Sequence, residues 1–317
     1  MSYANQPAWR EIQEFLPTSY RLTDATLPTE EWWEHRGHRI HLDTYRDPAA
    51  PVKVILFHGV GTNGRQMTTI LGRPLAARGY ETIAIDMPTY GVTQVAPDTL
   101  VTYDDWVTIG SELIDAELAK DDRPIVLYGL SAGGMETYHV AALNRRVSGI
   151  VGMTFLDQRS LRVRVETAFD PVSGLAGSTL MRLLARTPLR GLRLPMRLVS
   201  KMRALVNDRA AQRACYADPT SAGNKATVAF LDSYLNYRPV AEPEEFDVCP
   251  VLLTQPAADR WTPLHLSTPF LSRIAQVPVR QVMLENGGHY PIEQTALDPM
   301  VEAIDAFCAD VAGPAPA

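Results

Sequence analysis

The sequence has few cysteines and no long apolar run. Its three cysteines, Cys215, Cys249 and Cys308, lie far apart and form no CxxC pair. This excludes a disulfide scaffold and a cysteine-based metal cluster, and it is typical of buried free thiols in a reducing compartment. No stretch approaches the roughly 18 consecutive apolar residues of a membrane-spanning helix, so we predict no such helix.

Basic residues are not in excess either. The chain has 30 Lys and Arg against 36 Asp and Glu, a formal net charge of −6, and it has no nucleic-acid-binding motif, so we predict no nucleic-acid partner. The first residues carry charges and lack the apolar segment of a signal peptide, which favours a cytoplasmic location. With 46% hydrophobic residues among 317, the chain can bury a large core without a disulfide or a metal.

Near-continuous apolar segments alternate with segments of helical spacing along most of the chain. This pattern predicts an α/β fold, with a mostly parallel central sheet covered by helices on both faces. Residues 31–46 alternate around Gly37 and predict an antiparallel hairpin, whereas residues 1–28 are irregular with a short helix. The predicted core strands are 52–57, 81–86, 125–130, 148–155, 250–255 and 279–284, and the predicted helices are 66–78, 104–119, 131–144 and 292–311.

The strand–helix alternation stops for about 95 residues after the strand at 148–155. We therefore predict that residues 1–154 and 246–317 form one domain and that residues 155–245 form a helical cap (lid) inserted over the ligand-binding crevice. Between 155 and 240 there are 14 Lys and Arg against 6 Asp and Glu. Residues 176–206 combine these arginines with a leucine-rich stripe, which predicts either a core-facing helix pair or transient contact with a lipid surface.

Residues 129–133, Gly-Leu-Ser-Ala-Gly, match the G-x-S-x-G pattern of a serine nucleophile. A predicted strand ends at Leu130 and a predicted helix begins at Ser131. The sharp turn between them would expose the Ser131 hydroxyl near the positive end of the helix dipole. The alternative is a structural serine that caps the helix beside packing glycines.

Two backbone amides are candidates for the oxyanion hole that such a nucleophile needs. One is Ala132, directly after Ser131, and the other is Val60, between two glycines in the loop after the strand at 52–57. His58 in the same loop is expected to hold the loop in place by hydrogen bonding rather than to act as a base.

His289 is the candidate general base, because it follows the strand at 279–284 on a loop that contains two glycines. Asp259, after the preceding strand at 250–255, is the candidate acid, and it gives the chain order Ser, Asp, His. Asp157, after the strand at 148–155, is the rival acid. The remaining histidines are 35, 38, 41, 58, 139 and 265, and residues 35, 38 and 41 do not share one face of the hairpin, which disfavours a metal site there.

These motifs together resemble the α/β-hydrolase superfamily. The matching segments are FHGVG, GYETIAIDMPTYG, LYGLSAGG, PAADRWTP and GGHYP, and their order is most similar to the monoacylglycerol lipase, lysophospholipase and serine-aminopeptidase-like group. The resemblance implies esterase or lipase activity, a lid over the active site and no cofactor. One segment departs from the family pattern, because Tyr90 stands where a small or polar residue is usual.

The predicted function is therefore hydrolysis of a medium-chain or lipid-like carboxylic ester through an acyl-enzyme. Tyr90, Trp261 and Tyr290 are the predicted substrate-binding residues, since Trp261 and Tyr290 neighbour the proposed acid and base. The alternatives within the same fold are a serine peptidase or amidase and an acyltransferase. From a different class, the alternative is a binding protein without catalytic activity.

Overall fold

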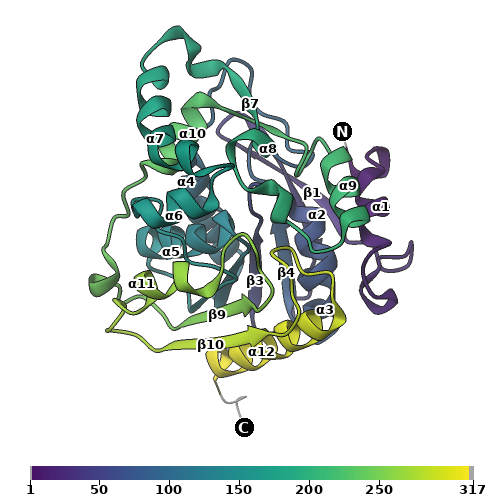
Figure 1. Cartoon of the computed structure of the whole chain (residues 1–317). Helices are drawn as coiled ribbons and strands as arrows, with labels where there is room; N and C mark the ends of the chain where they lie inside the picture. The colour runs from purple at the N-terminus through teal and green to yellow at the C-terminus, as the bar shows by residue number, and fades with distance from the viewer. Residues whose placement is uncertain (1, 314–317) are drawn as a thin grey trace.

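The computed structural model describes residues 2–313 and has a central mixed sheet of eight strands (Figure 1). Strand order is β1-β2-β4-β3-β5-β6-β9-β10. The pairs β1–β2 and β2–β4 are antiparallel and all others are parallel, which confirms the predicted fold class. The strands are β1 (Thr29–His35), β2 (His38–Tyr45), β3 (Lys53–Phe57), β4 (Glu81–Ile85), β5 (Ile125–Gly129), β6 (Gly149–Gly152), β9 (Val251–Pro256) and β10 (Val279–Leu284).

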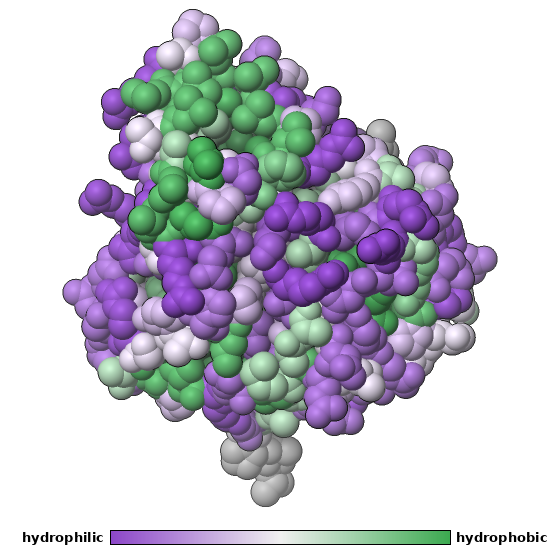
Figure 2. Space-filling view, in the orientation of Figure 1, coloured by the Kyte–Doolittle hydropathy of each residue, from purple (hydrophilic) through white to green (hydrophobic). Residues whose placement is uncertain are grey.

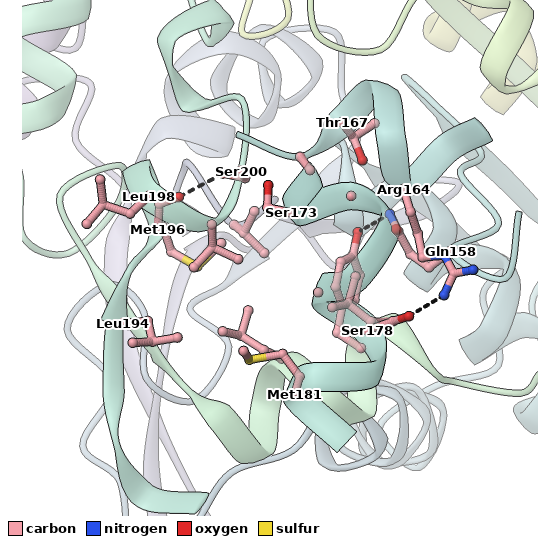
Figure 3. A pocket seen from close by; sticks show the side chains of 18 of the residues that line it. Gln158, Arg164, Thr167, Ser173, Ser178, Met181, Leu194, Met196, Leu198 and Ser200 are labelled. Carbon is pink, nitrogen blue, oxygen red and sulfur yellow. Dashed lines mark hydrogen bonds between the residues drawn. The ribbon is translucent and has the colours of Figure 1, made fainter. Parts of the chain in front are cut away.

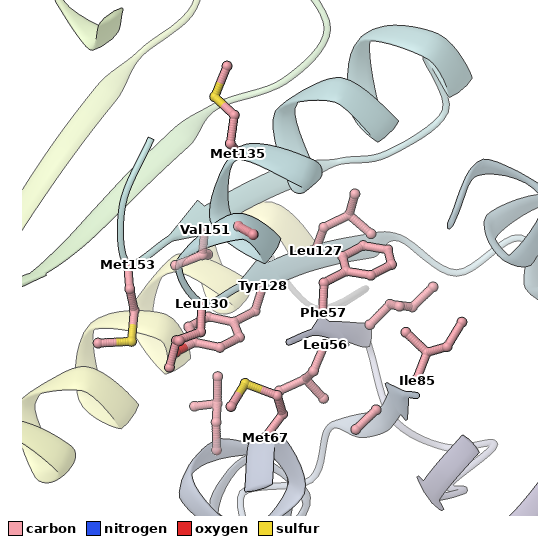
Figure 4. Packing of buried hydrophobic residues seen from close by; sticks show 14 of the residues in the cluster. Leu56, Phe57, Met67, Ile85, Leu127, Tyr128, Leu130, Met135, Val151 and Met153 are labelled. Carbon is pink, nitrogen blue, oxygen red and sulfur yellow. The ribbon is translucent and has the colours of Figure 1, made fainter. Parts of the chain in front are cut away.

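Side chains of β3 alternate between the two faces of the sheet, and each face is covered by its own helices. Phe57 packs towards α4, where a methyl group added at Gly110 would lie 3.2 Å from its ring. Leu56 points to the other face, 3.7 Å from a methyl group added at Gly72. Figure 4 shows this packing at the centre of the core. The helices of the sheet layers are α2 (Gly64–Met67), α3 (Arg73–Ala76), α4 (Tyr103–Leu118), α5 (Ala132–Asn144), α11 (Thr268–Leu271) and α12 (Gln294–Ala312).

Two predicted elements differ from the structure. The strand predicted at 148–155 ends at Gly152. The amide of Met153 still donates to the carbonyl of Gly129, but that of Phe155 donates to Ser267 Oγ, at 3.0 Å, and not to a neighbouring strand. The helix predicted at 66–78 is divided into α2, a π-helical turn over Thr68–Gly72, and α3. Pro74 lies at the start of α3, and since it has no N–H it cannot donate a regular helical hydrogen bond.

The chain between β6 and β9 adds no strand to the central sheet. We call residues 155–245 the cap segment, and it lies over one end of the sheet (Figure 1). Besides the predicted helices it contains a two-stranded antiparallel ladder that the sequence analysis missed. Its elements are α6 (Leu161–Thr167), α7 (Pro171–Ala185), β7 (Arg193–Pro195), α8 (Met196–Val199), α9 (Arg209–Ala217), β8 (Lys225–Thr227) and α10 (Val228–Leu235).

The leucine-rich stripe of the cap segment is divided between the interior and the surface. Met202 and Leu205 are fully buried, whereas Leu183 and Leu198 are each 58% exposed. The stripe does not form one helix face, because α7 ends at Ala185 and the chain then turns through a 3₁₀ helix into β7. Hydrophobic side chains consequently gather on the surface of the cap segment, at the top of the view in Figure 2.

Among residues 2–313, no helix combines the length and the apolar composition needed to cross a membrane. The three cysteines are free and buried, as predicted.

Candidate active site

Ser131 lies at the turn between β5 and α5 with φ 57° and ψ −119°, a backbone conformation that is rare for a residue with a side chain. The flanking glycines make this turn sterically possible. A Cβ at Gly129 would lie 1.9 Å from the carbonyl oxygen of Gly133, and a Cβ at Gly133 would lie 2.7 Å from that of Phe57. The Ser131 hydroxyl caps no amide of α5, so the geometry does not favour a structural helix-capping role.

Asp259 and His289 are in direct contact. Asp259 Oδ2 lies 2.8 Å from His289 Nδ1, and both side chains are buried. Asp259 Oδ1 accepts from the amides of Trp261 at 2.7 Å and Thr262 at 2.8 Å. Burial alone would raise the pKa of Asp259, but the charge of His289 and the hydrogen bonds from His289 and from the Thr262 hydroxyl and amide outweigh it and hold the pKa below its ordinary value.

His289 has one ring nitrogen available for proton transfer. Its Nδ1 is engaged by Asp259, while its Nε2 is buried and has no hydrogen-bond partner within residues 2–313. The ring packs 4.6 Å from the ring of Trp261, centre to centre. The neighbouring amide of Tyr290 donates to the carbonyl of Leu205, at 2.7 Å, and so attaches the histidine loop to the cap segment. This arrangement suits a base whose orientation is set from the Nδ1 side.

The loop that contains Val60 lies directly beside Ser131. A Cβ at Gly59 would be 2.8 Å from the Ser131 Cβ, and Val60 and Ser131 line the same cavity. Within the described residues, the amides of Val60 and Ala132 donate no hydrogen bond. Both therefore remain available to an oxyanion.

His58 holds this loop in place, as the sequence analysis expected. Its Nδ1 lies 2.9 Å from the carbonyl oxygen of Gly59, and its Nε2 accepts from the amide of Met87 at 3.0 Å. Burial lowers the pKa of His58, which favours the neutral ring that can accept this bond.

Ser131 lines an apolar cavity of about 430 Å³. Figure 3 shows part of its wall, with Met181, Leu194 and Met196 labelled. Of the three predicted substrate-binding residues, Trp261 lines the cavity, whereas Tyr90 and Tyr290 are not among the described residues of its wall. The hydroxyl of Tyr90 donates instead to the carbonyl of Val60, at 3.0 Å, so Tyr90 holds the loop that contains Val60. Apolar side chains that line the cavity from the cap segment include Met181, Leu194, Met196, Leu198, Val199 and Leu231.

Polar wall residues of the cavity were missed by sequence analysis. Gln158 and Tyr234 both line it, and the Gln158 amide donates to the Tyr234 hydroxyl at 3.1 Å. Arg164 and Ser178 also lie in the wall and are hydrogen-bonded to each other (Figure 3). These side chains come from different elements of the cap segment and share no motif, so no local pattern could have identified them.

Asp157, the rival acid, is engaged away from His289. It accepts from the amide of Arg159 at 2.9 Å and forms an ion pair with the Arg159 guanidinium at 2.8 Å. Arg159 also pairs with Glu242. The structure therefore places Asp157 in an ion-pair network within the cap segment.

The other histidines have structural partners. His41 is buried, with Nδ1 3.0 Å from Asp86 and Nε2 3.2 Å from Glu30. Burial lowers its pKa, but these carboxylates more than compensate and raise the pKa of His41 to about 10. His265 is exposed and lies 2.7 Å from Glu166. No group of three His, Cys, Asp or Glu side chains in residues 2–313 could hold a metal ion.

A family model described as the alpha/beta hydrolase family matches residues 54–303 of the chain. A search of curated protein sequences gave no match.

Among solved structures, the chain is similar to a soluble variant of monoglyceride lipase from Saccharomyces cerevisiae in complex with a substrate analog. The TM-score is 0.70 at 16% identity, covering 92% of this chain and 98% of that one. A monoacylglycerol lipase from Paleococcus ferrophilus matches with TM-score 0.66 and 18% identity, covering 86% and 99%. Est1E from Butyrivibrio proteoclasticus with bound ferulic acid matches with TM-score 0.59 and 16% identity, covering 90% and 100%. At these identities the likeness shows a shared fold.

Proposed function

Because the chain belongs to the alpha/beta hydrolase family, we propose that it is a serine carboxylic ester hydrolase acting through an acyl-enzyme. One observation carries this proposal: Ser131, held at positive φ, lies in the wall of an apolar cavity beside the free amide of Val60. The buried Asp259–His289 pair supplies the base that such a serine needs.

In the proposed reaction, Ser131 Oγ attacks the ester carbonyl carbon while His289 Nε2 takes the hydroxyl proton. The amides of Val60 and Ala132 stabilise the negative charge that develops on the carbonyl oxygen. His289 then returns the proton to the leaving alcohol, which leaves the acyl group on Ser131. Water, deprotonated by the same histidine, releases the acid. Asp259 keeps the Nδ1 proton in place and stabilises the imidazolium in both steps.

The cavity wall favours a substrate ester with an aliphatic acyl group. Its cap-segment side includes six leucines, two methionines and two valines, and each CH₂ buried there contributes up to about 0.8 kcal/mol. Within the described wall, Asp170 is the one carboxylate, and its oxygen already accepts the amides of Val172 and Ser173 at the start of α7. The wall therefore offers little to the free amine of an aminopeptidase substrate, which favours ester over peptide hydrolysis.

A series of p-nitrophenyl esters of increasing chain length, with aminoacyl p-nitroanilides as the amide counterpart, tests this proposal. We expect kcat/KM to rise with acyl length until the cavity is full, and anilides to be poor substrates. Leu194→Trp, which fills the cavity from β7, should shift the optimum to shorter chains. Leu189→Trp is the control, because Leu189 is 51% exposed and does not line the cavity.

An anilide preference would contradict ester hydrolysis as the main activity. An unchanged chain-length optimum in Leu194→Trp would show that the cap segment does not select the acyl group.

We also propose that the exposed apolar face of the cap segment touches anionic lipid surfaces, since arginines lie between its leucines. The double variant Leu183→Ser, Leu189→Ser should lower co-sedimentation with vesicles containing phosphatidylglycerol by about tenfold. Met283→Ser, which removes an exposed apolar side chain from β10, outside the cap segment, should leave this co-sedimentation unchanged. Equal binding to purely phosphatidylcholine vesicles would contradict the role of the arginines.

A further inference from the structure

A second, polar pocket adjoins the apolar cavity. Arg164 and Leu235 line both, so the two spaces meet at these side chains. The charged side chains of the second pocket are mostly positive. Its described wall contains four arginines and one glutamate, with the full set Arg159, Arg164, Arg182, Leu235, Asn236, Arg238, Pro239 and Glu242.

Internal ion pairs neutralise only one of these arginines. Arg159 is held between Asp157 and Glu242. Within residues 2–313, Arg164, Arg182 and Arg238 form no salt bridge, although Arg164 donates to Ser178 Oγ and Arg182 to Asn236 Oδ1. Three guanidinium groups therefore line one concave pocket without a carboxylate partner.

Arg164 differs from an ordinary surface arginine. Exposed arginines usually keep their charged head in water. The Nε atom of Arg164 is buried and has no hydrogen-bond partner within the described residues, and its side chain lies at the edge of the apolar cavity (Figure 3). A buried donor of this kind is costly unless a ligand or water accepts from it. Guanidinium groups bind phosphate and carboxylate oxygens with matched geometry.

We propose that Arg164, Arg182 and Arg238 form an anion subsite, which binds a phosphate or carboxylate carried by the substrate whose ester bond lies at Ser131. This inference rests on the proposed ester hydrolysis and specifies its substrate class as an anionic amphiphilic ester. The apolar cavity holds the aliphatic part, and Arg164 lies where the aliphatic and anionic parts meet.

The test compares esters that share one acyl chain and differ in charge. 1-Lauroylglycerol 3-phosphate is paired with 1-lauroylglycerol, and the p-nitrophenyl monoester of a terminal dicarboxylic acid is paired with the p-nitrophenyl ester of the corresponding monocarboxylic acid. For at least one pair we expect the wild-type protein to favour the anionic ester by about tenfold or more in kcat/KM, since charged hydrogen bonds are strong. A phosphate preference places the anion on the alcohol side, and a carboxylate preference places it on the acyl side.

The double variant Arg182→Gln, Arg238→Gln should reduce this preference by about tenfold, and adding Arg164→Gln should remove the remainder. Arg190→Gln is the matched control, because Arg190 is an exposed cap-segment arginine outside both pockets and should leave the ratio unchanged. A wild-type protein without charge preference would overturn the subsite, and so would an equal loss in Arg190→Gln. Failure to hydrolyse the neutral esters would instead count against the proposed function itself.

Discussion

Replacing Ser131 by alanine is expected to lower kcat for a p-nitrophenyl ester by a factor on the order of 10⁶, the loss typical of removing a serine nucleophile from a triad. The change deletes one oxygen and leaves the turn intact, because alanine has the same Cβ as serine at this strained position. Binding and the oxyanion amides should sustain only a small residual rate. Initial rates of nitrophenol release measure the effect, and circular dichroism and thermal melting confirm that the variant folds.

Ser178→Ala is the matched control for this experiment. Ser178 lines the same cavity but donates to no base, and its hydroxyl accepts from Arg164. Its loss should change kcat less than tenfold, and labelling by a fluorophosphonate should persist. Labelling of the Ser131→Ala variant, or turnover near the wild-type rate, would place the nucleophile elsewhere.

Asp259→Asn is expected to reduce kcat by about 10³–10⁴-fold. The reason lies in the surrounding hydrogen bonds. Oδ1 accepts from the amides of Trp261 and Thr262, so the oxygen of an asparagine side chain will stay there. Its NH₂ group will then face His289 Nδ1. A donor at this place makes Nδ1 the acceptor and puts the ring proton on Nε2, where it prevents His289 from taking the proton of Ser131. The measurement is kcat on the same ester.

Asp157→Asn is the comparison that decides between the two carboxylates. The Asp157 carboxylate forms an ion pair with Arg159 at a partly exposed site, where such a pair contributes little to folding stability. We therefore expect less than a tenfold change in kcat. A larger loss for Asp157→Asn than for Asp259→Asn would transfer the role of the acid to Asp157.

Local chemistry made the central features of this protein predictable. Apolar strand segments and helical spacing are recognised over short stretches of sequence, and they predicted the succession of strands and helices along the chain without knowledge of the packing. The turn at Ser131 could also be predicted from the sequence. Its glycines are needed locally, because a Cβ at Gly129 or Gly133 would collide with backbone only a few residues away or on the adjacent strand. The contact between Asp259 and His289 could be predicted from chain order, since loops at the carboxyl ends of adjacent parallel strands converge at one edge.

The substrate side depended on contacts between distant parts of the chain. Tyr90 and Tyr290 neighbour key positions in sequence, yet tertiary packing buries both, and it turns the Tyr90 hydroxyl to Val60 rather than to the cavity. The leucines of the cap segment looked alike in sequence, but tertiary packing buried Leu205 beside Gly61 and left Leu183 exposed. The sequence by itself determined the strands of the central sheet, apart from the exact end of β6, and the residue types that follow them, because those depend on neighbours along the chain. Only the tertiary structure decided which side chains line the cavity and which arginines, within residues 2–313, have no carboxylate partner, because both depend on what the folded chain places opposite them.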